Sequence, residues 1–244
     1  MKGEEVIRGS ETQSISPSVL PLGRNDVRPP SSPHVLPSTH DCVQYGCGWC
    51  APDTWLNFDC SLTLRFERLP LVGRIYTRNE KRFPDNVRYG DIVRGLPIAP
   101  NSCHAIYCSH ILEHLSLEDF DVALRHTYSY LEPGGTFRLV VPDLEQLARG
   151  YLAEDTPEAA ARFMEESFLG RKQRPRGFRG FVVEWLGNSH HLWMWDQKAM
   201  TAKLAEHGFT DIRRATFGDA DDKRFNDVED KGRFVGSLAM QCHK

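Results

Sequence analysis

Residues 104–141 constrain the fold more than any other part of the chain. They contain an apolar strand candidate at 104–108, a helix candidate that begins after Ser116 and runs to Leu131, a Glu-Pro-Gly-Gly turn and a second apolar strand candidate at 136–141. Strands joined through a crossover helix run parallel, and strands that are apolar along their whole length are typical of sheets covered on both faces. The stretch therefore predicts a parallel sheet of the α/β class.

The chain from about residue 41 onward continues this pattern. Further strand candidates lie at 43–45, 55–59, 86–89, 209–213 and 233–241, and further helix candidates lie at 61–69, 143–151, 157–168 and 196–207. Strands that alternate with helices are typical of βαβ units. We expect one α/β domain over residues 41–244.

Residues 1–40 differ in composition from the rest. They hold seven Ser and six Pro, and their aliphatic patches are short. Such a segment buries too little apolar surface to offset the entropy of ordering it. We expect a disordered N-terminal extension here.

The overall composition argues against several classes of protein. Thirty basic and 33 acidic residues give a net charge of −3, which argues against a surface built for nucleic acid. No apolar run reaches the length of a membrane span, and the start of the chain lacks the apolar core of a signal peptide. Seven irregularly spaced cysteines do not form a secreted disulfide pattern, so a reducing, cytoplasmic compartment is the expectation.

The residues that follow the first four strand candidates have chemistry suited to a nucleoside ligand. Ligands of open α/β sheets bind at the carboxyl ends of the strands. Glycine lets the backbone approach a ligand, and a carboxylate accepts hydrogen bonds from the two hydroxyls of a ribose or from an adenine amino group. In chain order the strands are followed by Gly46 and Gly48, Asp59, Asp91, and Ser109 with His110.

These segments give the chain a resemblance to a known family. It resembles the class I S-adenosylmethionine-dependent methyltransferases with a type 11 methyltransferase domain, and the matching segments are 45–48, 55–59, 90–97, 106–114 and 131–138. The resemblance implies a three-layer, Rossmann-like α/β fold whose seven strands are mostly parallel and whose last strand is antiparallel. It also implies a helical cap or acceptor region at 145–200. The implied reaction is O-methylation of a small-molecule or glycan-type acceptor.

The resemblance also implies roles for individual residues. Asp59 would hold the ribose hydroxyls of S-adenosylmethionine, Asp91 would hold the adenine amine and Ile92 would pack on the adenine ring. The residues expected beside the methionine moiety or the ribose are Tyr45, Gly46, Gly48, Ser109 and His110.

The connection between the first two strands is shorter than the family pattern. Ten residues separate Gly48 from Asp59, whereas a crossover between parallel strands usually needs a dozen or more and a helix. We expect a loop in place of the first helix, and a cofactor pocket that is more open there or covered by another helix, such as one from residues before 41. The short crossover also motivates the alternative of a catalytically degenerate scaffold that only binds cofactor.

Two metal-site alternatives remain open. The spacing of His110, Glu113 and His114 matches the H-x-x-E-H pattern of a zinc-dependent hydrolase. Four cysteines also fall within 19 residues, at positions 42, 47, 50 and 60, a spacing that resembles zinc and iron–sulfur sites. The methyltransferase interpretation itself requires no metal.

The region after the fifth strand candidate supplies the expected acceptor site. Histidine titrates near neutral pH, so His190, His191 or His114 is a candidate general base for an acceptor hydroxyl. Glu184, Trp193 and Arg176, the last within the basic run 171–179, are candidate acceptor-binding residues. The acidic run from Asp219 to Asp230 is expected to be a solvated loop.

Overall fold

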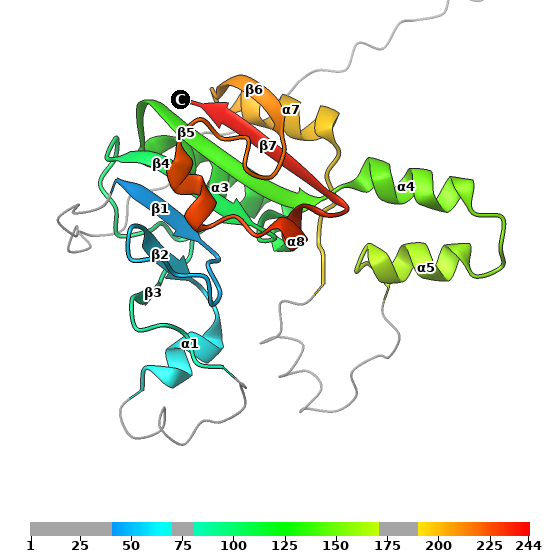
Figure 1. Ribbon diagram of the computed structural model, residues 1–244, viewed down its shortest axis with the longest axis horizontal. Coiled ribbons are helices and arrows are strands. Elements are labelled where there is room, and N and C mark those ends of the chain that lie inside the picture. The colour runs from blue at the N-terminus through cyan, green and yellow to red at the C-terminus, as the bar shows by residue number, and fades with distance from the viewer. Residues whose placement is uncertain (1–40, 70–80, 171–189) are drawn as a thin grey trace, which may run out of the picture. The chain divides into compact units, whose positions relative to one another are not determined.

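The structure is a computed structural model that describes residues 41–69, 81–170 and 190–244 (Figure 1). The expected N-terminal extension, residues 1–40, lies outside the described residues. Among the described residues, no helix combines the length and the apolar character needed to cross a lipid bilayer.

In the described part of the chain, seven strands form one sheet with the order β3-β2-β1-β4-β5-β7-β6. Neighbouring strands from β3 to β5 are parallel, whereas β7 runs antiparallel to both β5 and β6. This confirms the predicted seven-stranded α/β sheet with an antiparallel last strand. The strands are β1 (Cys42–Tyr45), β2 (Leu56–Asp59), β3 (Val87–Tyr89), β4 (Cys103–Ser109), β5 (Leu131–Pro142), β6 (Thr210–Ala215) and β7 (Ser237–His243).

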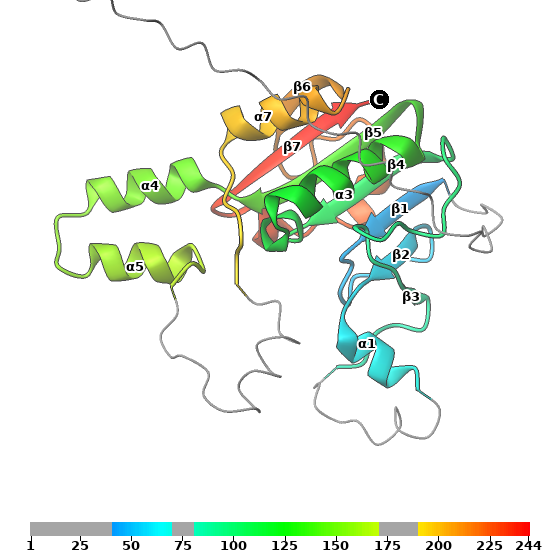
Figure 2. The ribbon, with the colours of Figure 1, turned by 180° about the vertical axis from the view of Figure 1, so that it is seen from behind.

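Two helices cover one face of the sheet, as Figure 2 shows. They are α3 (Leu117–Tyr130) and α7 (Gln197–Glu206). The Ser116 side chain accepts a hydrogen bond from the Asp119 N–H at the start of α3, so the predicted cap is confirmed. Phe120 and Leu124 of α3 and Met200 of α7 are fully buried in the same core cluster, together with the side chains of β4 and β5 that point to this face.

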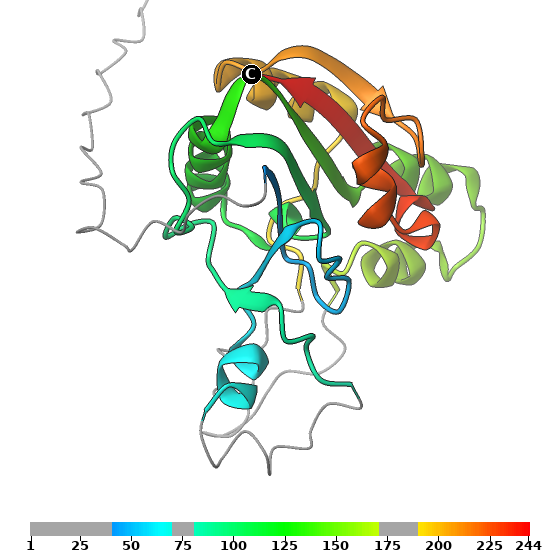
Figure 3. The same ribbon diagram turned by 60° about the vertical axis from the view of Figure 1, so that its left-hand side comes forward.

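The opposite face is covered by the chain between β6 and β7 rather than by a long helix. This segment contains the 3₁₀ helix η2 (Lys223–Asp227) and the short helix α8 (Lys231–Phe234), both visible beside the sheet in Figure 3. Its side chains Ala220, Phe225 and Val228 are buried against the sheet. The prediction of a solvated acidic loop at 219–230 is therefore wrong, and the strand predicted from 233 begins only at Ser237.

A buried arginine on β5 explains why acidic residues lie on this face. Arg138 is 1% exposed. Its Nε donates to Glu229 Oε1 at 2.8 Å, and its Nη1 donates to Asp219 Oδ1 at 2.9 Å. A buried guanidinium needs such partners, so the carboxylates of Glu229 and Asp219 are drawn onto the sheet.

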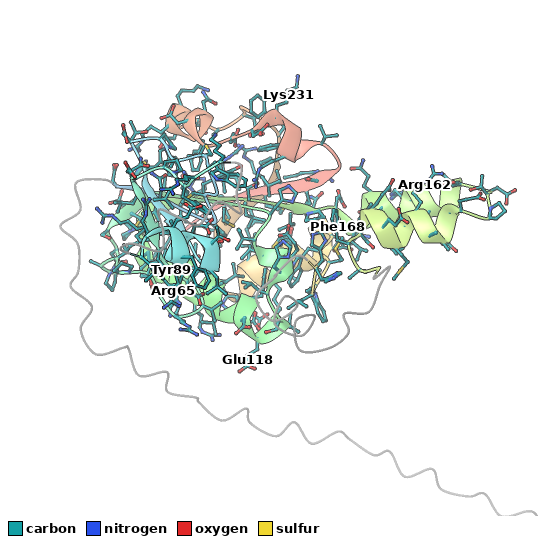
Figure 4. The ribbon with its side chains drawn as sticks, turned by 90° about the horizontal axis from the view of Figure 1, so that it is seen from below. Arg65, Tyr89, Glu118, Arg162, Phe168 and Lys231 are labelled. Carbon is teal, nitrogen blue, oxygen red and sulfur yellow. The ribbon has the colours of Figure 1, made fainter. Side chains whose placement is uncertain are left out.

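The connection from β1 to β2 has no helix, as expected from its length. Trp55 from this loop is 2% exposed, and its ring meets that of Phe225 edge-on at 5.5 Å. The helix expected to cover this side is replaced, in the described part of the chain, by Trp55 and the 219–230 segment. After β2, α1 (Leu62–Glu67) lies beside the edge strand, with Arg65 over the ring of Tyr89 at 5.0 Å (Figure 4).

Two further helices follow β5, at positions close to those predicted. They are α4 (Leu144–Ala153), which Asp143 caps, and α5 (Ala159–Glu166). The two helices lie side by side (Figures 1 and 2), with the rings of Tyr151 and Phe163 5.7 Å apart.

Candidate functional site

The carboxyl ends of β1, β2 and β3 bring the predicted cofactor residues to one edge of the sheet. Tyr45 is paired with Phe58 and Asp59 with Tyr89, so Gly46, Asp59 and Gly90 follow one another across the edge. The Gly90 N–H donates to the Asp59 carbonyl at 3.1 Å. Residues that follow successive strands in the sequence therefore lie side by side at the edge of the sheet.

Asp59 is held in a fixed orientation at this edge. Its Oδ2 accepts from the Gly48 N–H at 3.0 Å and its Oδ1 accepts from the Ser61 N–H at 2.8 Å. A carboxylate has about four lone-pair sites, so both oxygens retain capacity for another hydrogen bond. Asp59 is largely buried, with 9% of the residue exposed.

The two glycines of the first loop have left-handed backbones but different surroundings. Gly46 has φ +70° and Gly48 has φ +53°. A Cβ on Gly46 would lie 2.1 Å from Cγ1 and Cδ1 of Ile111, whereas a Cβ on Gly48 would meet no atom within 4 Å. Ile111 therefore packs directly over Gly46, and the backbone at Gly48 stays open for a ligand.

This difference predicts unequal costs for two alanine substitutions. Gly48→Ala should destabilise the protein by about 1 kcal/mol, the cost of a left-handed non-glycine residue. Gly46→Ala should cost clearly more, because Ile111 must also move. Urea unfolding of both variants measures the difference, and equal costs would show that Ile111 does not pack on Gly46.

The third strand end places Asp91 at the edge and Ile92 beneath it. Asp91 Oδ1 accepts from the Val93 N–H at 3.0 Å, and its Oδ2 lies 3.5 Å from Arg94 Nε. Ile92 is 5% exposed and belongs to the core cluster. Tyr45 also points inward, since its hydroxyl shares a hydrogen bond with Thr127 Oγ1 of α3 at 3.2 Å.

A cavity of about 290 Å³ opens beside the ends of β1 and β4. Tyr45, Gly46 and Ser109 from the predicted set line it, together with Tyr107 and Arg233. The buried hydroxyls of Ser109 and Tyr107 lie beside this cavity and interact with each other, and no other described residue pairs with either of them. Both hydroxyls therefore retain hydrogen-bonding capacity for a ligand in the cavity.

His110 faces two hydrogen-bond acceptors. Its backbone has φ +55°. Its Nδ1 lies 3.2 Å from Glu113 Oε1 and its Nε2 lies 3.0 Å from the Arg233 carbonyl. Burial lowers the pKa of His110, but the hydrogen bonds to Glu113 and to the carbonyl raise it more, so its pKa lies above the usual value. Its Nε2 donates to the Arg233 carbonyl, so this nitrogen is not available as a metal ligand.

A second cavity, of about 380 Å³, adjoins His110 and contains a cluster of three side chains. Ligand atoms of Glu113, His114 and His191 all lie within 4.8 Å of one another. Glu113 and His114 come from the 3₁₀ helix η1 (Leu112–His114) that follows β4. The ring centroids of His114 and His191 are 5.1 Å apart.

Backbone hydrogen bonds of the two residues after His191 hold it beside η1. The Leu192 and Trp193 N–H groups both donate to the Glu113 carbonyl, at 2.7 and 3.1 Å. The ring of Phe168, which follows α5 and is labelled in Figure 4, lies 5.1 Å from that of His191. Residues distant in sequence thus form one wall of the second cavity.

The two histidines of this cluster have the same tautomer. His114 Nδ1 donates to the His190 carbonyl at 3.0 Å and His191 Nδ1 donates to the Ser167 carbonyl at 2.8 Å. Each ring therefore has an unprotonated Nε2 when neutral. Burial lowers the pKa of His191 more than the nearby Glu113 carboxylate raises it, which favours the neutral ring.

The remaining residues predicted for the acceptor site lie outside the cluster or outside the described residues. His190 is outside the cluster, with its Nδ1 3.4 Å from the Phe168 carbonyl. Trp193 is 43% exposed and its ring lies 6.2 Å from that of Trp195. Glu184 and Arg176 lie outside the described residues.

The structure does not form either metal site considered from the sequence. Because of its backbone conformation His110 turns to Arg233, so His110, Glu113 and His114 do not form the two-histidine helix face of a zinc hydrolase. The cysteines at 42, 47, 50 and 60 form no set of three close ligand atoms, and within the described ranges only the cluster of Glu113, His114 and His191 does so. Cys42 and Cys47 are buried, whereas Cys50 and Cys60 are exposed.

Sequence reasoning missed two residues of the site. Arg233 lines the first cavity, and its Nη1 donates to the Ser109 carbonyl at 3.2 Å. Its own carbonyl accepts from Nε2 of His110, which lines the second cavity. Ile111 covers Gly46. No local sequence pattern marks either residue, since both act through contacts between distant segments.

The residues of this edge lie within a segment that is similar to known proteins. Residues 43–139, which run from β1 into β5 and include every predicted cofactor residue, match the family model described as a methyltransferase domain. This segment is therefore similar to a methyltransferase domain.

Individual proteins that are similar to this chain share less than a third of their aligned residues with it. An uncharacterized protein of Saccharomyces cerevisiae is 29% identical over 157 residues, which cover 59% of this chain and 17% of the yeast protein. A SAM-dependent methyltransferase from Archaeoglobus fulgidus is 14% identical with a TM-score of 0.45, over 83% of this chain and 85% of that one. A putative S-adenosylmethionine-dependent methyltransferase from Listeria monocytogenes is 19% identical with a TM-score of 0.46, over 86% and 94%.

Proposed function

We propose that this chain transfers a methyl group from S-adenosylmethionine to a hydroxyl oxygen of a small-molecule or glycan-type acceptor. The observation that carries the proposal is the edge formed by Gly48, Asp59 and Asp91 within the segment that is similar to a methyltransferase domain. When bound, the cofactor supplies an electrophilic methyl group on a sulfonium centre. The remaining work of binding, orienting and activating belongs to the residues of the chain.

The edge supplies the cofactor contacts. Asp59 accepts hydrogen bonds from the ribose hydroxyls, and its two backbone donors hold it ready to do so. Asp91 accepts from the adenine amine, while Ile92 forms the floor beneath it. The open backbone at Gly48 and the buried Ser109 hydroxyl contact the rest of the cofactor.

The second cavity supplies the acceptor site. It adjoins the first because the consecutive residues Ser109 and His110 line one cavity each. His114 and His191 present unprotonated Nε2 atoms there, which activate an acceptor hydroxyl for in-line attack. An acceptor hydroxyl is protonated at neutral pH, so transfer of its proton to a neutral imidazole assists the attack.

Calorimetric titration of the full chain with S-adenosylhomocysteine tests the cofactor assignment. We expect one-to-one, micromolar binding and none of NADH. Asp59→Ala should weaken binding at least about 100-fold, because two hydrogen bonds to a charged group are lost. Asp53→Ala is the matched control, since Asp53 lies in the same crossover loop but is exposed and bonded to Asn86.

Folding of the variants is checked by their melting curves, and Asp59→Asn retains one acceptor oxygen if the alanine variant unfolds. Unchanged affinity in both Asp59 variants would remove that residue from the ribose site. Transfer of isotope-labelled methyl to sugars and other hydroxyl compounds, with the product bond identified, tests the acceptor. Labelling at nitrogen or carbon alone would contradict O-methylation.

A further inference from the structure

We propose that Glu113, His114 and His191 form a binding site for a divalent transition-metal ion of the zinc class. The three residues offer one carboxylate oxygen and two imidazole nitrogens whose positions all lie within 4.8 Å of one another. Two histidines and a carboxylate, with a further position left open, are the ligand set of many catalytic zinc sites. Bonds of about 2.0–2.2 Å to one ion would draw the three groups inward from their present separations.

The tautomers of both histidines match those of metal ligands. A metal-bound histidine donates its other ring N–H to a carbonyl or carboxylate, which orients the ring and keeps the ligating nitrogen unprotonated. His114 Nδ1 donates to the His190 carbonyl and His191 Nδ1 donates to the Ser167 carbonyl. Both Nε2 atoms are thus left for a ligand, and His191 Nε2 lies 4.0 Å from Glu113 Oε1.

Glu113 supplies the second, independent observation. Its side chain is 1% exposed, and its Oε2 has no hydrogen-bond partner among the residues that the structure describes. The Nδ1 of His110 occupies only Oε1. A buried carboxylate oxygen without a partner costs considerable free energy, and a cation bound at this oxygen removes that cost.

The site is rigid on the protein side and open on the other. The double hydrogen bond from Leu192 and Trp193 to the Glu113 carbonyl ties the segment of His191 to the segment of Glu113 and His114. The remaining side faces the second cavity, which Glu166 and Ser237 also line. The ligand count of three leaves room there for an oxygen atom of another molecule.

The role of the ion rests on the proposed function, whereas its binding does not. A hydroxyl of the acceptor that binds the open position would have a lowered pKa. His114 and His191 would then activate the acceptor by holding the ion rather than by taking the proton themselves. The proton of the hydroxyl would pass to solvent.

The test titrates the full chain, freed of metal by a chelator, with Zn²⁺ and with Co²⁺. We expect one equivalent of either ion, and a visible Co²⁺ spectrum without the near-ultraviolet band of cobalt–thiolate bonds. Glu113→Gln and His191→Ala should weaken Zn²⁺ binding at least about 10-fold, the lower bound for loss of even an outer partner of a metal ligand. His104→Ala should retain full binding, although His104 also lies beside two carboxylates, Glu132 and Asp222.

Each other outcome overturns the site. No binding by the intact chain, unchanged binding by folded Glu113→Gln or His191→Ala, or a thiolate band that assigns the ion to cysteines would each contradict it. His114→Ala replaces either variant if it fails to fold. Titration of the same samples with S-adenosylhomocysteine separates the two proposals, because Gly48, Asp59 and Asp91 share no side chain with the metal cluster.

Discussion

Arg138→Met is expected to destabilise the protein by about 3–5 kcal/mol, the cost of removing one partner from a buried ion pair. The methionine fills much of the same volume but leaves the Glu229 carboxylate, whose side chain is fully buried, without its guanidinium. Urea unfolding followed by circular dichroism measures the loss. The double variant Arg138→Met/Glu229→Met should recover part of it, because no charge then remains buried and unpaired at these positions.

Arg213→Met is the matched control for this substitution. Arg213 also pairs with Asp219, at 2.8 Å, but its side chain is 39% exposed. Exposed ion pairs contribute less than about 1 kcal/mol. If both arginine variants lose the same stability, burial of Arg138 does not determine its contribution.

The same network makes stability depend on pH in the acid range. Burial raises the pKa of Asp219, but hydrogen bonds from Arg213, the Thr216 N–H and Arg138 lower it further, and the net pKa lies well below the usual range. A depressed pKa stabilises the folded state above the unfolded value of about 4, and this contribution is lost as the pH falls through the folded pKa. The free energy of unfolding should therefore fall less steeply with acid in Arg138→Met than in the unchanged chain.

Trp55→Ala is the second substitution with a large expected effect, a loss of about 3–5 kcal/mol. Trp55 is the main apolar side chain that the helix-free crossover contributes to its face of the sheet, and it packs against Phe225. The alanine would leave a cavity between the crossover and the 219–230 segment, because Phe225 and its neighbours are already packed against the sheet. Thermal and urea unfolding measure the loss, and Trp55→Phe should recover more than half of it.

Trp49→Ala serves as the control from the same crossover. Trp49 is 49% exposed, although it stacks on Phe83 and donates to the Lys81 carbonyl. We expect its removal to cost about 1 kcal/mol. An equal or larger loss at Trp49 would mean that the crossover is held mainly at its outer end rather than at Trp55.

Much of the central fold could be predicted because its signals are local. Apolar strands such as 104–108, the cap at Ser116 and the Glu-Pro-Gly-Gly turn specify a βαβ unit through neighbouring residues alone. The position of Gly46, Asp59 and Asp91 at one edge of the sheet was also predictable, since parallel strands bring the residues after each strand together. Their roles toward a cofactor stay a prediction. The length of the first crossover alone correctly predicted a loop in place of a helix.

The parts that sequence reasoning missed depend on contacts between distant segments. The acidic run 219–230 has the composition of a solvated loop. Its burial follows from ion pairs with Arg138, which precedes Asp219 by 81 residues and Glu229 by 91. The arginine inside an apolar strand was the available signal. Similarly, the pattern of His110, Glu113 and His114 predicts two histidines on one face of a helix. The left-handed backbone at His110 directs its ring elsewhere, and the histidine that lies beside Glu113 and His114 in the cluster is His191.

The cover supplied by residues 219–230 has a consequence for the order in which the chain can fold during synthesis. The ring of Trp55 emerges from the ribosome before Ala220, Phe225 and Val228, which share its core cluster but lie more than 160 residues later in the chain. Until then this face of the sheet is open to water. The final packing of the face therefore has to wait until the 219–230 segment has been synthesised.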